Sequence, residues 1–62
     1  MKKEIKSGMW VIDTTGVYEV TDVDDHYQTV YLKEVIYNDD GTYTLAGYRR
    51  LTMAEARSKE IV

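Results

Sequence analysis

The chain has 62 residues, a length that supports one domain with a small hydrophobic core. It has no cysteine, which excludes disulfides and thiolate metal sites, and its formal net charge of −3 argues against duplex DNA as a partner, since duplex binders need a basic face. There is no apolar run of membrane-span length and no signal-peptide core, so we expect a cytoplasmic protein without a membrane partner.

The N-terminal part of the sequence predicts two strands joined by a tight turn. Residues 1–7 are polar apart from Ile5, and we expect either a loose leader or a short edge strand there. Strands are predicted near residues 8–13 and 16–23, on either side of the turn sequence Asp13–Gly16.

The register expected for this first hairpin gives one strongly apolar face. Ile12 is predicted to lie opposite Tyr18, and Trp10 opposite Val20. Trp10 is therefore predicted to be a core residue.

The second strand is followed by an acidic stretch. Val23 breaks the apolar alternation of the strand, so we expect a bulge near Thr21 or Asp22. The possible metal ligands of this stretch match neither the calcium-loop nor the zinc-site spacing, and we expect a solvated turn with no metal and no cofactor. These residues are Asp22, Asp24, Asp25 and His26.

The strongest hairpin signal lies between Thr29 and Leu51. Two runs rich in β-branched and aromatic residues, near 27–37 and 42–50, flank the turn Asn38–Gly41, whose glycine suits the left-handed conformation after a type I turn. Gly47 lies inside the second run, which predicts a bend or a change of partner there.

Continuous alternation along this hairpin brings tyrosines and cations onto one face. The predicted pairs include Tyr37 with Tyr43 and Tyr31 with Arg49, around an apolar centre. Aromatic and cationic side chains on a sheet suit a protein interface or a single-stranded nucleic-acid platform, whereas cross-strand tyrosines can also simply stabilise the sheet. The candidate binding residues are Tyr31, Lys33, Tyr37, Tyr43 and Arg49, with Val35 and Leu45 as the apolar centre.

The C-terminal residues predict a short helix. Thr52–Glu55 has the spacing of a capping box, and a helix near 53–61 follows from it. This helix is only weakly amphipathic, so it must dock on the rest of the fold or on a partner, and the tyrosine face is one surface it could cover. The chain is therefore expected to be a single domain, 1–62, with the barrel at 8–51 and the helix at 52–62.

These elements predict a mainly β fold, either a small antiparallel barrel or a strongly bent sheet of four or five strands with a short C-terminal helix. The segments Ile5–Val11, Gly16–Val23 and Thr29–Leu32 resemble the opening strands of small barrels of the Src-homology-3 type. Gly47–Leu51 is similar to the closing strand of short proteins of bacteriophages and mobile elements. The resemblance spans residues 5–51 and implies a binding module from a phage or plasmid.

No catalytic residues are predicted, because His26 has no partner at a recognised catalytic spacing and the four glycines lie too far apart for a phosphate loop. We therefore expect a binding protein and not an enzyme. The leading hypothesis is a protein-interaction module, with a phage-encoded modulator of a host or defence enzyme in the host cytoplasm as its finer form. The alternatives are a nucleic-acid-binding accessory barrel and an acidic mimic of nucleic acid.

Overall fold

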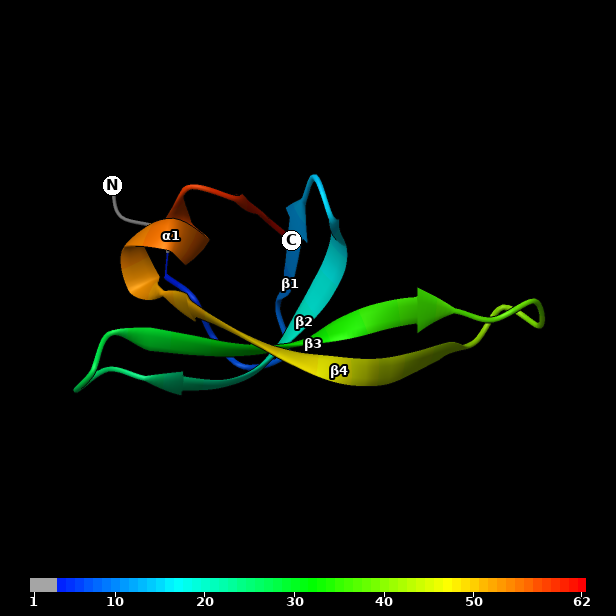
Figure 1. Cartoon of the computed structure of the whole chain (residues 1–62), viewed down its shortest axis with the longest axis horizontal. Helices are drawn as coiled ribbons and strands as arrows, with labels where there is room; N and C mark the ends of the chain where they lie inside the picture. Colours follow the sequence, from blue (N-terminus) through cyan, green and yellow to red (C-terminus); the bar gives the residue numbers. More distant parts are fainter. Residues whose placement is uncertain (1–3) are drawn as a thin grey trace.

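The computed structural model describes residues 4–62, which form one five-stranded antiparallel sheet and one short helix (Figure 1). The sheet order is β4-β3-β2-β1-β5, so the first four strands form a meander and the C-terminal strand returns to pair with β1. This confirms the mainly β fold in its bent-sheet form, because the sheet does not close into a barrel. The elements are β1 (Trp10–Asp13), β2 (Gly16–Asp24), β3 (Thr29–Tyr37), β4 (Tyr43–Thr52), α1 (Met53–Arg57) and β5 (Glu60–Ile61).

The core lies on the concave face of the sheet, beneath α1 (Figure 1). The prediction of a leader or edge strand at 1–7 falls partly on residues 1–3, which lie outside the described residues. Residues 4–9 form no strand, and Ile5 is buried in the core. The core cluster consists of Ile5, Val11, Tyr18, Val20, Val30, Leu32, Leu51, Met53 and Ala56.

The β1–β2 register differs by one residue from the predicted one. Trp10 lies opposite Glu19, and Val11 lies opposite Tyr18. Because side chains alternate between the two faces of a strand, this shift puts Val11 in the core and turns Trp10 to the other face. The prediction that Trp10 is a core residue is therefore wrong: Trp10 is half-buried and lies outside the core cluster.

The two hairpin turns look alike in sequence but are braced at different positions. The Asp13 carboxylate accepts hydrogen bonds from the Thr15 amide at 2.6 Å and the Thr15 hydroxyl at 2.7 Å. The Asp40 carboxylate accepts the same pair from Thr42, at 3.0 and 2.6 Å. The structural counterpart of Asp13 is thus Asp40, although the spacing to the closing glycine in the turn sequences Asp13–Gly16 and Asn38–Gly41 would match it to Asn38. The first loop is consequently shorter, and this accounts for the register shift.

A β-bulge in β2 lies where the sequence predicted it. Val20 pairs with Leu32, but the next paired residue of β2 is Asp22, which lies opposite Tyr31. Thr21 is the extra residue of β2, and its insertion restores the inward direction of the apolar residues that follow.

A second register shift occurs at the glycine of β4. Ala46 lies opposite Glu34 as predicted, but Arg49 lies opposite Leu32, so Gly47–Tyr48 faces a single residue of β3. Gly47 has φ +71°, a conformation that residues with a side chain rarely adopt. The bend predicted at Gly47 is confirmed, and it changes the pairing of everything that follows in β4.

The C-terminal helix is shorter than predicted. Its capping box is present, with the Glu55 amide donating to Thr52 Oγ1 and the Thr52 amide donating to Glu55 Oε1, both at 3.1 Å. The helix ends at Arg57 and does not continue to residue 61. The last residues pair with β1 instead, through two 2.8 Å hydrogen bonds between the backbones of Trp10 and Val62. This pairing provides hydrogen-bond partners for the backbone groups at the outer edge of β1, which a longer helix would leave unpaired.

Within residues 4–62, no helix has both the length and the apolar character needed to cross a membrane.

Candidate functional site

Three aromatic side chains meet on the face of the sheet opposite the core. The Trp10 ring lies edge-on to Tyr43, with 5.4 Å between ring centroids, and edge-on to Tyr37, at 6.2 Å. Tyr37 and Tyr43 directly face each other across β3 and β4. We call Trp10, Tyr37 and Tyr43 the aromatic cluster. Tyr37 is 64% exposed and Tyr43 47% exposed, so the cluster is open to solvent although its rings contact each other.

The aromatic cluster lies beside an apolar residue that is buried separately from the main core. Val35 lies two positions before Tyr37, on the same face of β3, and is opposite Leu45. It is only 6% exposed, yet it does not belong to the core cluster beneath α1. The outer face of the sheet therefore has a small apolar centre of its own.

A carboxylate fixes the orientation of two of the three rings. The Trp10 indole Nε1–H donates to Glu19 Oε1 at 3.1 Å, and the Tyr43 hydroxyl donates to the same oxygen at 3.4 Å. Glu19 is the register partner of Trp10 on β2, so the one-residue register shift of the first hairpin creates this contact.

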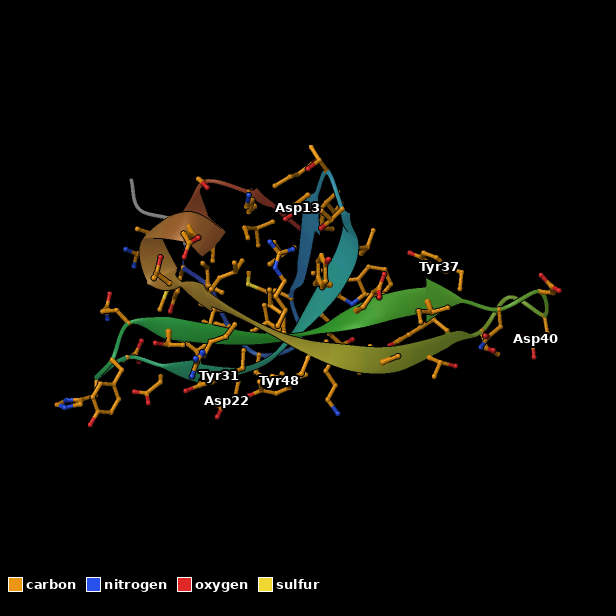
Figure 2. All side chains as sticks on the ribbon, viewed as in Figure 1. Asp13, Asp22, Tyr31, Tyr37, Asp40 and Tyr48 are labelled. Atoms are coloured by element: carbon orange, nitrogen blue, oxygen red, sulfur yellow. The ribbon has the colours of Figure 1, made fainter. Side chains whose placement is uncertain are left out.

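The structure brings Tyr37 and Tyr43 together, as predicted, but separates Tyr31 from them. The Tyr31 ring contacts Tyr48, with 6.1 Å between centroids. The β3–β4 ribbon is twisted. Tyr31 and Tyr48 therefore lie on one side of the ribbon near its middle, and Tyr37 lies on the other side near its end (Figure 2). Lys33 lies between these two groups along β3 and is exposed.

Arg49 does not join the predicted binding face. The predicted pairing of Tyr31 with Arg49 is wrong: after the Gly47 bulge, Tyr31 lies opposite Arg50, and Arg49 turns to the concave face. There the Arg49 guanidinium lies 5.0 Å from the centre of the Tyr18 ring and donates from Nη1 to Asp13 Oδ2 at 3.1 Å.

Asp13 is the centre of a polar network that Arg49 completes. Lys59 Nζ lies 3.8 Å from the same Asp13 oxygen. The hydrogen bonds from Thr15, followed by the charges of Arg49 and Lys59, lower the pKa of Asp13 from 3.8 to about 2. The pKa of Arg49 is raised, first by its interaction with the Tyr18 hydroxyl and then by the charge of Asp13. Arg49 therefore joins β4 to Asp13 of β1 on the concave face.

Sequence reasoning missed Trp10, Glu19 and Tyr48 as surface residues. The core position predicted for Trp10 is wrong, and Glu19 lies opposite Trp10, both because of the one-residue shift in the first turn. The Asp-x-Thr pattern at Asp13–Thr15 is the signal that could have corrected this shift, since the aspartate braces a two-residue loop.

The two acidic turns lie at opposite ends of the molecule (Figure 1). Figure 2 places Asp22 in the half of the molecule that ends in the β2–β3 turn, and Asp40 at the far tip of the β3–β4 hairpin. The acidic groups of the two turns therefore do not form one cluster in space. Within residues 4–62, no group of three or more potential metal ligands lies close enough together to hold an ion.

A pocket of about 340 Å³ lies beneath α1, away from the aromatic cluster. Its lining mixes acidic and basic side chains and includes one hydroxyl, that of Ser7, which donates to the Thr21 carbonyl at 3.3 Å. Among residues 4–62, no histidine lines it. The lining residues are Glu4, Ile5, Lys6, Ser7, Asp22, Val23, Asp25, Met53 and Arg57.

Comparison of the chain with protein-family models, with curated proteins and with solved structures gives no match.

Proposed function

We propose that this chain is a non-catalytic protein-binding module whose binding surface is the aromatic cluster. The observation that carries the proposal is the combination of order and exposure in Tyr37 and Tyr43. Both rings are held against Trp10, yet they leave 64% and 47% of their residue surface in water.

Such a surface suits a protein partner for two physical reasons. Tyrosine and tryptophan offer large amphipathic contact area and are enriched in the centres of protein interfaces. Rings that already contact one another lose little side-chain freedom when a partner arrives, so less of the interaction energy is spent on ordering them. The buried Val35 beside the cluster adds to its rigidity.

The finer form of the proposal concerns the origin of the partner. The resemblance of residues 5–51 to small barrels of the Src-homology-3 type and to short phage proteins supports a host or defence enzyme as the partner, met in the host cytoplasm. Single-stranded nucleic acid is less favoured, because Arg49, one of the cations expected on this face, instead pairs with Asp13 on the concave face.

The proposal is tested by capturing partners with the whole chain and with tyrosine variants. The test variant carries Tyr37→Ser and Tyr43→Ser. The control is Tyr27→Ser, since Tyr27 is 73% exposed and lies in the β2–β3 turn, where its ring contacts only His26 among the aromatic contacts of residues 4–62. A melting temperature is measured for each variant, and each is used to capture proteins from host lysate.

Loss of a captured protein with the double variant, retention with Tyr27→Ser and similar melting temperatures for both would support the proposal. Capture that survives the double substitution would contradict it. A large fall in the melting temperature of the double variant alone would also contradict it, because the tyrosines would then be needed for the fold.

A further inference from the structure

The carboxylate inside the aromatic cluster differs from the other half-buried carboxylate of the first hairpin. Asp13 lies within 4 Å of two cations, Arg49 and Lys59. Glu19 accepts hydrogen bonds from Trp10 and Tyr43, which are both neutral donors. The ion pairs among residues 4–62 do not include Glu19.

The negative charge of Glu19 is therefore held against aromatic rings without a counter-ion from the described chain. Lys33 is its register partner on β3, but the Lys33 side chain is exposed and forms no ion pair with Glu19. A partly desolvated carboxylate gains from a cation that a ligand supplies, because the pair attracts more strongly there than in bulk water.

The rings around Glu19 favour the same kind of ligand group. The faces of tryptophan and tyrosine rings attract cations, and tryptophan does so most strongly. A guanidinium group fits better than an ammonium group, since it is planar, stacks on rings and donates a fork of hydrogen bonds to a carboxylate. Asp39 and Asp40 follow Tyr37 closely in the chain and add negative charge at the end of the same hairpin.

We propose that the aromatic cluster and Glu19 bind an arginine side chain of a basic segment in the protein partner. This inference rests on the proposed function, because it names the chemistry of the group that the cluster receives. Charge complementarity supports it: Glu19 on β2 with Asp39 and Asp40 in the β3–β4 turn outnumber Lys33 on β3, and the chain as a whole has a net charge of −3.

The test uses the intrinsic fluorescence of Trp10, the single tryptophan of the chain, which lies in the site itself. The probe is an eight-residue glycine–serine peptide containing two arginines. Its control is the same peptide with citrulline in both places, which keeps the size and the planar shape but removes the charge. We expect a saturable fluorescence change with the arginine peptide and binding that is weaker by roughly tenfold or more with citrulline.

Variants of the chain test the role of the carboxylate. Glu19→Gln should weaken binding of the arginine peptide by roughly tenfold, while retaining a hydrogen-bond acceptor for Trp10. Glu34→Gln removes the same charge from the opposite face of the sheet and should change the affinity by less than about twofold. Lys33→Gln should strengthen binding by about two- to threefold, because it removes the competing cation.

Equal binding of the two peptides, or unchanged binding after Glu19→Gln, would overturn the arginine assignment. So would a Trp10 response to a single-stranded oligonucleotide in place of the peptide. In each of these cases, partner capture that depends on Tyr37 and Tyr43 would leave the proposed function standing. Absence of that capture would instead contradict the proposed function itself.

Discussion

Arg49 on β4 lies 3.1 Å from Asp13 on β1, although β3 and β2 separate their strands in the sheet. The two residues are 36 positions apart in the chain. They can meet only because the sheet curves until the concave faces of its first and fourth strands approach each other. The two ends of the meander are thus joined by a side-chain ion pair, and not by a closed ladder of backbone hydrogen bonds.

The Asp13 network predicts a specific loss of stability in acid. The pKa of Asp13 is lowered from 3.8 to about 2 in the folded protein, first by the Thr15 hydrogen bonds and then by the cations. A carboxyl group with a depressed folded pKa stabilises the fold above its unfolded pKa, and this contribution disappears as the pH falls from near 3.8 through about 2. Urea denaturation between pH 5 and pH 2 measures the effect.

The variant Asp13→Asn provides the comparison for the acid prediction. The pKa values of Asp40 and Glu55 are also lowered, by hydrogen bonds with Thr42 and Thr52, so part of the acid sensitivity remains in any variant. Asp13→Asn should be less stable than the parent at pH 6, and the difference should shrink towards pH 2. A difference that stays constant over this range would show that the charge of Asp13 does not stabilise the fold.

The turn glycine of the long hairpin is expected to tolerate asparagine but not valine. Gly41 has φ +86°, and no atom lies within 4 Å of the position its Cβ would take, so the cost of substitution is conformational and not steric. Gly41→Val should destabilise the fold by about 1–2 kcal/mol, whereas Gly41→Asn should cost clearly less. Thermal melting of the two variants checks this, and equal melting temperatures would mean that the turn adopts another conformation.

Two aliphatic residues of β3 should respond very differently to truncation. Leu32 is fully buried, and Leu32→Ala should cost about 2–5 kcal/mol. A core of this size supplies only roughly 3–5 kcal/mol of net stability, so the variant should be partly or wholly unfolded at 25 °C. Ile36 is 42% exposed, and Ile36→Ala should cost less than about 1.5 kcal/mol. Similar losses in chemical denaturation would contradict the assigned location of the core.

The capping box should contribute more to the stability of the fold than the short length of its helix suggests. α1 has five residues, but it covers the core with Met53 and Ala56. Thr52→Ala removes the acceptor of the Glu55 amide and should cost about 0.5–2 kcal/mol. Thr14→Ala, in the exposed β1–β2 turn, is the matched control and should change stability by less than about 0.5 kcal/mol. Circular dichroism and thermal melting compare the two.

The first four strands and both irregularities could be predicted from local signals. Alternation marked β3 and β4, the interruption at Val23 indicated the bulge at Thr21, and Gly47 indicated the bend in β4. Each of these signals comes from residues close together in the chain. They were sufficient for the meander of the first four strands and for the pairing of Tyr37 with Tyr43.

Which side chains share a face was harder to predict, because the face of each residue depends on the number of residues in the turn or bulge that precedes it. One residue fewer in the first loop moved Trp10 to the surface, and one extra residue in β4 moved Arg49 to the concave face. The helix length was overestimated for another reason. Residues 60–61 form hydrogen bonds with β1, a partner about 50 positions away that no local pattern reveals.

The Gly47–Tyr48 bulge also determines how the two faces of β4 can change in evolution. Because facing alternates at every residue, pairing the same residues without the bulge would exchange inside for outside along the rest of β4. Pairing without the bulge, with Tyr48 opposite Leu32, would bring Arg49 opposite Tyr31 and take one of the two cations away from Asp13 in the same step. A substitution of Gly47 that removed the bulge would thus alter both faces of β4 together, whereas substitutions at Tyr37 or Tyr43 would change the aromatic cluster while the concave side stays intact.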